Sequence, residues 1–330
     1  MRFITQMEQF RQGKLFFLFL AFLLGFLLCL SFSTSSFVTT MLDTTLLLGN
    51  TSHDLALAAS TPGPATAKNL QGLIAVIIEP RCHPALPVVV RNVRERLPSV
   101  PIHIFHGANN KKAVETWFHG SASVVVRRIP GAFYTNFSWD AYTTLFTDVR
   151  FWDELLRDSA FRDKVLIFQT DSWICPSNAE EYLEKFLQYD YIGAPWPWGF
   201  GFGSDCNGIG NGGFSLRSAR AMSKITKKHG IVLGSKPPED IYFCIHLAAQ
   251  EDPVRPQLAE AQMFAWEKQL NPRHDKELPL SSDRPPLGLH RVMSDPFYGS
   301  LTSSELARLQ KWCPDIDALR IASRNKNYSC

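Results

Sequence analysis

Uninterrupted apolar runs alternate with stretches of helical character along the middle of the chain, and this alternation limits the fold more than any other feature. The apolar runs lie at residues 73–78, 102–105, 123–126, 164–168 and 191–192. Stretches with helical patterns lie at residues 87–97, 109–118, 149–159 and 179–188. Apolar runs without polar alternation are typical of strands that are buried on both faces of a parallel sheet. The sequence therefore predicts an α/β fold with a doubly wound, mostly parallel sheet.

A second strong feature is the apolar stretch 15–32, which contains no charged residue. As a helix with a rise of about 1.5 Å per residue it would span about 27 Å, close to the hydrocarbon thickness of an endoplasmic reticulum bilayer. Residues 1–14 carry three basic side chains, and the next Lys or Arg is Lys68. This asymmetry predicts a cytosolic tail at 1–14 and a transmembrane signal anchor at 15–32. A cleaved signal peptide with a cut near 33–36 is the alternative.

Both alternatives place the rest of the chain in the secretory pathway. Residues 33–70 are rich in Ser, Thr, Ala and Gly, which predicts a flexible stem, and residues 71–330 form the predicted lumenal domain. Glycosylation sequons begin at Asn50, Asn136 and Asn327. The six cysteines beyond the anchor form an even set that suits disulfide bonds, although the sequence does not give their pairing. We expect a single-pass type II protein of the Golgi or endoplasmic reticulum membrane.

The charge balance excludes one class of partner. Lys and Arg number 34 and Asp and Glu number 31, so the formal net charge is only +3. The sequence also has no dense basic run and no zinc-finger spacing of cysteines and histidines. We therefore expect no nucleic-acid partner.

Polar residues follow the ends of two predicted strands, where ligands bind in sheets of this kind. Glu79 and Arg81 follow the first: the Arg could pair with a phosphate and the Glu could accept from a sugar or base, or the two could form a surface ion pair. Gln169 and Asp171 follow the fourth. The Asp171 carboxylate suits Mg²⁺ or Mn²⁺ that bridges a diphosphate, or it could cap the next turn.

A long segment at 193–217 is rich in Gly, Pro and Trp. Residues 208–213 formally match the Gly-x-Gly-x-x-Gly pattern, but no strand precedes them and no helix opens there. The glycines more simply allow the backbone to approach a ligand closely. Trp196 and Trp198 could stack on a sugar ring or pack beneath the loop.

Two further positions carry chemistry that depends on their surroundings. Glu239 and Asp240 follow two prolines and precede an apolar stretch, which predicts the start of a helix. They could complement the helix dipole, or one of them could be a general base. His290 follows a short apolar stretch and could be structural or a metal ligand.

Taken in order, these motifs resemble the core of GT-A-fold glycosyltransferases, which have an Asp-x-Asp motif, a glycine loop, an x-Glu-Asp motif and a C-terminal His. Five segments are also similar to a fungal and bacterial family of domains of unknown function that is regarded as glycosyltransferase-like: 77–81, 168–172, 191–196, 210–217 and 238–243. The resemblance covers roughly residues 71–295. It implies a single GT-A-like, Rossmann-like catalytic domain.

The resemblance also implies an activity and a role for each matching residue. The enzyme, of the hexosyltransferase type, would move a sugar from a nucleotide-sugar donor, expected to be a UDP-sugar, to a hydroxyl of a glycan or glycoconjugate. Asp171 would bind the metal and the donor diphosphate, with His290 as a further contact. Gly212 and Gly213 would line the donor and acceptor pocket. Asp240 would deprotonate the acceptor in an inverting displacement, with Glu239 as the substitute base.

One position departs from the pattern that carries the resemblance. Gln169 stands where the first Asp of the Asp-x-Asp motif is expected. An amide is a poorer ligand than a carboxylate for a hard dication such as Mn²⁺ or Mg²⁺. Either metal affinity is lower, or Arg81 and other cations assist the diphosphate, so metal dependence is left open.

Three other functions compete with the transferase hypothesis. The change at Gln169 motivates a non-catalytic glycan-binding or scaffold protein on a degenerate transferase fold. A hydrolase that uses Asp171 and Asp240 as paired carboxylates is less favoured. A Cys–His nucleophile is least favoured, because cysteines in an oxidising lumen are poor candidates for a reactive thiol.

Overall fold

The computed structural model describes residues 70–158, 161–196, 210–234, 236–267, 284–292, 299, 301–325, 328 and 330. The chain divides into two compact units, Met1–Gly63 and Pro64–Cys330, and the described residues all belong to the second. The predicted tail, anchor and nearly all of the stem therefore lie outside the described residues, as do Trp198 and the sequon residues Asn50 and Asn327. Across the described ranges, no helix combines the length and the apolar character needed to cross a membrane.

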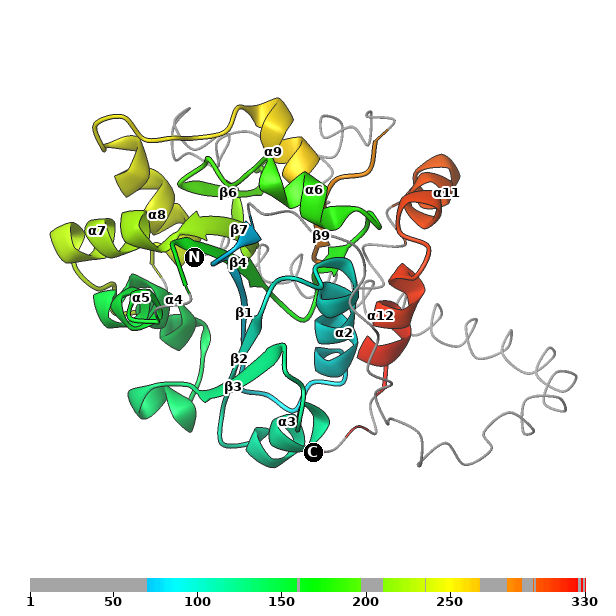
Figure 1. Ribbon diagram of the computed structural model, residues 1–330, viewed down its shortest axis with the longest axis horizontal. Helices are drawn as coiled ribbons and strands as arrows, with labels where there is room; N and C mark the ends of the chain where they lie inside the picture. Colours follow the sequence, from blue (N-terminus) through cyan, green and yellow to red (C-terminus); the bar gives the residue numbers. More distant parts are fainter. Residues whose placement is uncertain are drawn as a thin grey trace, which may run out of the picture. The chain divides into compact units, whose positions relative to one another are not determined.

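A six-stranded mixed sheet forms the centre of the described domain, with the strand order β3-β2-β1-β4-β7-β6 (Figure 1). Its strands are β1 (Ile74–Glu79), β2 (Ile102–His106), β3 (Val124–Arg128), β4 (Lys164–Phe168), β6 (Tyr191–Ala194) and β7 (Asn211–Ser218). Strands β1 to β4 pair in parallel, whereas β7 is antiparallel to both of its neighbours. The predicted α/β class and mostly parallel sheet are thus confirmed, with one strand reversed.

The reversal of β7 has a local cause in the sequence before it. The sequence between β6 and β7 is rich in Gly and Pro, a composition that disfavours a crossover helix. Neighbouring parallel strands need such a crossover, whereas antiparallel strands do not. Because β7 runs against β4, with Phe214 opposite Phe168, its first residues lie at the edge where β4 ends. This register brings the glycine loop to the residues that follow β4.

Helices cover both faces of the sheet (Figure 1). On one face lie α2 (Leu86–Arg96), α6 (Ala179–Glu184), α9 (Leu258–Phe264), α11 (Ser303–Trp312) and α12 (Ile316–Ser323). The other face is covered by α4 (Trp139–Thr147), α5 (Val149–Leu156), α7 (Ala219–His229) and α8 (Glu239–Ala248). In β1, Ala75 and Ile77 face the first group, while Ile74, Val76 and Ile78 face the second. Burial on both faces explains why the strand sequences do not alternate with polar residues.

Five shorter elements complete the described domain. Helix α3 (Lys111–Trp117) and the 3₁₀ helix η2 (Gly131–Tyr134) flank β3 in the sequence. A small second sheet has the order β5-β9-β8, formed by β5 (Trp173–Ile174), β9 (Gly288–His290) and β8 (Ala265–Glu267). In its register Glu267 is opposite His290. The second sheet therefore carries a buried acid and a buried His to one end.

Disulfide bonds link distant parts of the described domain. Cys82 is bonded to Cys330 and Cys175 to Cys313, and Cys244 is disulfide-bonded as well. These bonds agree with the expectation that an even set of cysteines is paired.

Removing the Cys175–Cys313 bond should destabilise the domain. Both cysteines are buried in the core and lie 138 positions apart in the sequence. We expect the double variant Cys175→Ala/Cys313→Ala to lose about 2–5 kcal/mol of unfolding free energy, because the unfolded chain is no longer restricted by that loop. Urea unfolding followed by circular dichroism measures the change. Reducing agent should lower the urea midpoint of unfolding less in the variant than in the wild type. If the variant without reducing agent had the same urea midpoint as the wild type, the prediction would be contradicted.

Candidate active site

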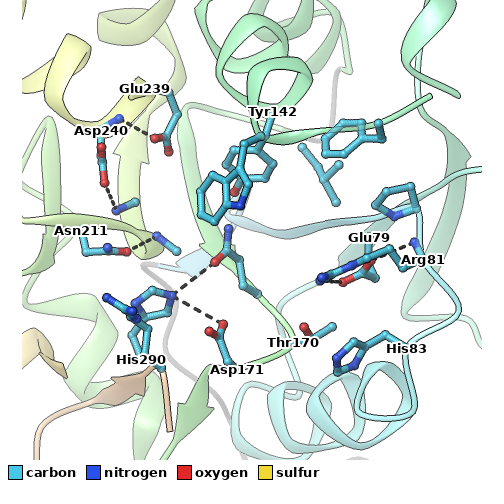
Figure 2. A pocket seen from close by; sticks show the side chains of 18 of the residues that line it. Glu79, Arg81, His83, Tyr142, Thr170, Asp171, Asn211, Glu239, Asp240 and His290 are labelled. Carbon is cyan, nitrogen blue, oxygen red and sulfur yellow. Dashed lines mark hydrogen bonds and ion pairs between the residues drawn. The ribbon is translucent and has the colours of Figure 1, made fainter. Parts of the chain in front are cut away.

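A cavity of about 640 Å³ lies at the edge of the sheet where β1 and β4 end and β7 begins (Figure 2). This volume is within the range of small-molecule sites, which is roughly 300–1,000 Å³. Nine of the residues singled out in the sequence line the cavity: Glu79, Arg81, Gln169, Asp171, Gly212, Gly213, Glu239, Asp240 and His290. The fold therefore gathers groups that are separated by more than two hundred positions in the sequence.

His290, the last residue of β9, lies between two carboxylates, of which Figure 2 shows that of Asp171. Its Nε2 is 3.5 Å from Oδ1 of Asp171, and its Nδ1 is 3.0 Å from Oε2 of Glu267. The same Nε2 is 3.3 Å from Oε1 of Gln169. Burial disfavours the imidazolium, but Asp171 and Glu267 outweigh burial, and the pKa of His290 is raised. Arg291 holds the other oxygen of Glu267 at 3.1 Å.

These contacts test whether the site could hold a divalent cation. The carboxylate of Asp171 and the amide oxygen of Gln169 both approach Nε2 of His290, and Glu267 holds the other ring nitrogen of His290. A carboxylate behind a His is the usual support of a metal-binding imidazole. In the part of the chain that the structure describes, no group of three or more His, Cys, Asp or Glu side chains is suited to a metal. The set at this site differs because its third donor is the amide oxygen of Gln169. The donors fit a cation such as Mn²⁺, with one negative charge fewer than two carboxylates would supply.

Restoring that charge should tighten metal binding. We expect Gln169→Asp to bind Mn²⁺ at least about tenfold more tightly than the wild type, because a second carboxylate attracts the ion at short range. Titration of free Mn²⁺, followed by its electron paramagnetic resonance signal, measures the affinity without any turnover. Gln169→Asn is the matched control, since it keeps an amide. Equal or weaker Mn²⁺ binding by Gln169→Asp would show that these donors do not share an ion.

On another wall, Asp240 lies in the first turn of α8 and is half-buried. Its Oδ2 accepts a hydrogen bond of 3.3 Å from the backbone N–H of Gly212, and its Oδ1 accepts one of 2.8 Å from the N–H of Ile241. Loss of hydration, together with the charge of neighbouring Glu239, raises the pKa of Asp240 to about 7. A carboxyl group with such a pKa can take up and release a proton near neutral pH.

Glu239 differs from Asp240 in its surroundings. It is buried, and its Oε1 accepts a hydrogen bond of 2.8 Å from Nη2 of Arg217. Arg217 is fully buried and also donates to the carbonyl of Gly212 and to Oγ of Ser215. The Glu239 carboxylate is thus committed to an internal ion pair, and Asp240 is the better placed of the two to act as a base.

The two adjacent glycines allow β7 to pass close to both halves of the site. A Cβ atom on Gly212 would collide with the side chains of Glu239 and Arg217. A Cβ atom on Gly213 would collide with His290 and with Gln169. The glycine loop is therefore required for packing, in addition to any contact of its backbone with a ligand.

Glu79 and Arg81 form the remaining predicted wall of the cavity. Arg81 makes a bidentate ion pair with Glu79, with Nε–Oε1 and Nη2–Oε2 distances of 2.8 and 2.7 Å. Glu79 is buried, whereas the Arg81 side chain is 69% exposed. The hydrogen bonds that Arg81 donates to Glu79 raise the pKa of Arg81, and burial lowers the pKa of nearby His83. The predicted ion pair between Glu79 and Arg81 is thus present, and it holds the Arg81 guanidinium at the cavity.

One predicted site residue lies elsewhere. Trp196 is only 8% exposed and packs in the core cluster that also contains Tyr191 and Phe243. It is not among the residues that line the cavity. Trp196 lies two residues after the end of β6 and its ring is buried, so the proposed sugar stacking does not suit it. Trp198 lies outside the described residues.

The cavity also has lining residues that the sequence did not single out. Tyr142 and Trp139 belong to α4, His83 follows β1, and Arg291 follows His290 with a positive φ of 59°. A signal for the first two was present, because aromatic residues are concentrated between 133 and 142. Arg217, which does not line the cavity, was not predicted as a site residue. Its signal was a charged side chain in a segment that also contains Phe214 and Leu216.

A family model identifies the relationship of this chain. The model described as "Protein of unknown function (DUF5672)" matches residues 124–290, which is half of the chain. The chain belongs to the DUF5672 family. The part that matches DUF5672 contains the Gln169–Asp171 segment, the glycine loop, Asp240 and His290, while Glu79 and Arg81 precede it. A search of curated protein sequences finds no match.

Solved glycosyltransferase structures have limited similarity to this DUF5672 protein. A mannosyltransferase from Pyrobaculum calidifontis in complex with GDP-Man and Mn²⁺ is 10% identical over 47% of this chain and 46% of its own, with a TM-score of 0.34. The galactosyltransferase LgtC, in complex with donor and acceptor sugar analogues, is 11% identical over 72% and 95%, with a TM-score of 0.42. GlyE from Streptococcus pneumoniae is 13% identical over 78% and 64%, with a TM-score of 0.43. The chain thus covers less than two thirds of the mannosyltransferase and of GlyE.

Proposed function

We propose that the protein is a glycosyltransferase that moves a sugar from a nucleotide-sugar donor, expected to be a UDP-sugar, to a hydroxyl of a glycan or glycoconjugate. The observation that carries the proposal is the meeting of two kinds of group in one cavity. One is the donor set of Asp171, Gln169 and His290, and the other is the Asp240 carboxyl, whose pKa is raised to about 7. Such a pair of sites suits a reaction in which a diphosphate leaves while a hydroxyl loses its proton.

In the proposed reaction the acceptor oxygen attacks the anomeric carbon of the donor sugar. Its proton passes to Asp240, and the bond between the anomeric carbon and the diphosphate oxygen breaks, so that the diphosphate leaves with the negative charge. Asp171, Gln169 and His290 would hold a divalent cation, which when bound would neutralise charge on the diphosphate. Arg81, which also lines the cavity, supplies a cation of the protein itself.

The location of the protein is part of the proposal. We place the anchor at 15–32 and the stem at 33–70, with the domain in the lumen of the Golgi or endoplasmic reticulum as a type II membrane protein. The disulfide bonds of the described domain support an oxidising compartment.

The direct test is a donor screen on the full chain in detergent micelles. Calorimetry with UDP-sugars and GDP-sugars, with and without Mn²⁺, should find a donor whose binding is weakened in Asp171→Asn. Mass spectrometry of mixed glycan acceptors should then detect a mass gain of one sugar. Absence of donor binding under every metal condition would favour the glycan-binding or scaffold alternative. Release of free sugar from glycosides without any nucleotide would favour a hydrolase.

A further inference from the structure

One aromatic side chain at the cavity is left uncovered by the protein. Trp139, the first residue of α4, lines the cavity and is 77% exposed. Among the large hydrophobic residues that the described ranges leave exposed, it is the one with an aromatic ring. An indole in water at the rim of a pocket leaves a large apolar face available to a ligand.

The backbone that carries Trp139 is held firmly. The Ser138 side chain caps α4 by accepting a hydrogen bond of 3.2 Å from the N–H of Ala141. Three residues after Trp139, the buried Tyr142 packs against Phe146 and Phe137 with ring-centroid distances of 4.7 and 6.1 Å. The start of α4 is thus anchored by its cap and by an aromatic cluster, so the indole is presented from a fixed helix turn.

The position of Trp139 relates it to one part of the cavity. Residues three apart on a helix lie on the same face, so Trp139 and Tyr142 are neighbours. Tyr142 lies in the cavity (Figure 2) and interacts with Gln169, Glu239 and Asp240. In addition, α4 packs directly on α8, the helix that begins with Glu239 and Asp240. Trp139 therefore belongs to the wall of Asp240, whereas Glu79 and Arg81 come from the end of β1.

We propose that Trp139 is the stacking surface for the ring of the acceptor sugar, a carbohydrate-binding position built on the first turn of α4. The inference rests on the proposed function, since it assigns the acceptor to the side of the cavity where Asp240 would take the proton. The C–H groups on one face of a pyranose pack against an indole face, and its hydroxyls remain free to point elsewhere. A sugar ring held in this way would present a hydroxyl to Asp240.

The experiment compares Trp139→Ala, Trp139→Phe and the control Leu233→Ala in the full chain in detergent. Leu233 is 81% exposed and is not part of the cavity lining, so its loss reports only on a change of exposed surface. All three changes leave the sequon at Asn136–Ser138 intact. Two readouts are taken: saturation-transfer NMR with a panel of p-nitrophenyl pyranosides, and calorimetry with the donor from the screen above.

We expect Trp139→Ala to weaken pyranoside binding by about tenfold or more and to raise the KM for a transferred acceptor by a similar factor. Donor affinity should stay unchanged. Trp139→Phe should recover much of the loss, and Leu233→Ala should bind as the wild type does. Weaker donor binding in Trp139→Ala with unchanged pyranoside binding would overturn the proposal in favour of a nucleobase contact. Equal pyranoside binding by all variants would also overturn it.

The two proposals can fail separately. If the wild type bound pyranosides but no nucleotide sugar, and Trp139→Ala lost the pyranoside binding, sugar transfer would be refuted. The carbohydrate-binding position at Trp139 would still stand. If Trp139→Ala transferred sugar as well as the wild type does, the transferase proposal would stand and the stacking surface would be refuted.

Discussion

Replacing Asp240 with Asn should lower the rate of sugar transfer by about 10²- to 10⁴-fold and leave donor binding nearly unchanged. The amide has almost the shape of the carboxylate, and its single oxygen can accept one of the two hydrogen bonds that the N–H groups of Gly212 and Ile241 donate to separate carboxylate oxygens. It cannot, however, take the proton of the acceptor. Initial rates at saturating donor, together with donor calorimetry, separate these two effects.

The control for this variant is Asp153→Asn, which changes a carboxylate of α5 that pairs with Lys227 and does not line the cavity. It should transfer sugar at the wild-type rate. If Asp240→Asn also transferred at that rate, Asp240 would not be the base. Activity lost equally in Asp153→Asn would show that the rate responds to a general change of charge.

The raised pKa of Asp240 also predicts how activity and stability depend on pH. The wild-type rate should fall as pH drops below about 7, because the protonated carboxyl cannot act as a base. The folded state holds this proton more tightly than the unfolded state does, since the pKa rises from 3.8 to about 7 on folding. The contribution of Asp240 to stability is therefore present at low pH and is lost as pH rises through this window. Urea unfolding should therefore show that the unfolding free energy falls less between pH 5 and pH 8 in Asp240→Asn than in the wild type.

The second large effect is expected at Arg217. Its guanidinium is fully buried, pairs with Glu239 at 2.8 Å and lies over the rings of Phe146, Tyr191 and Phe243. Arg217→Met should cost about 3–5 kcal/mol of unfolding free energy, because it leaves the Glu239 carboxylate buried without its partner. Urea unfolding measures this cost.

A double variant makes the cause testable. In Arg217→Met/Glu239→Gln the buried negative charge is removed as well, so much of the stability should return. Arg150→Met is a control at an ion pair with Asp148 where the Arg side chain is 84% exposed, and it should change stability little. If Arg217→Met unfolded like the wild type, or if the double variant were less stable than the single one, the ion pair would not hold this part of the site.

Prediction from the sequence succeeded where a local pattern sufficed. Strand β4 occupies the predicted residues 164–168, and β1 is shifted by one residue from its predicted range, because apolar runs of this length have few alternatives to a buried strand. The residues at and just beyond the ends of those strands were expected to lie together, since strand ends in a doubly wound sheet share one edge. The cavity lining agrees with that expectation for Asp171 and Glu79.

Features that depend on distant partners were not predictable. Glu239 and Asp240 are equivalent in the sequence, and only the arrival of Arg217 from β7 distinguishes them. Trp196 and Trp139 are both tryptophans outside the strands, yet the first is buried in the core after β6 and the second is exposed at the start of a helix at the rim of the cavity. The pairing of the cysteines likewise required the tertiary fold.

The Cys82–Cys330 bond has a consequence for how the cavity is kept in shape. Cys82 lies between Arg81 and His83, which both line the cavity, and its partner is 248 positions away. Thiol reductants would break this bond and so remove the covalent tether of the turn that carries Arg81. The protein should therefore be purified without dithiothreitol before any ligand is titrated. Reduction would let the Arg81 turn move and would change phosphate binding independently of Asp240.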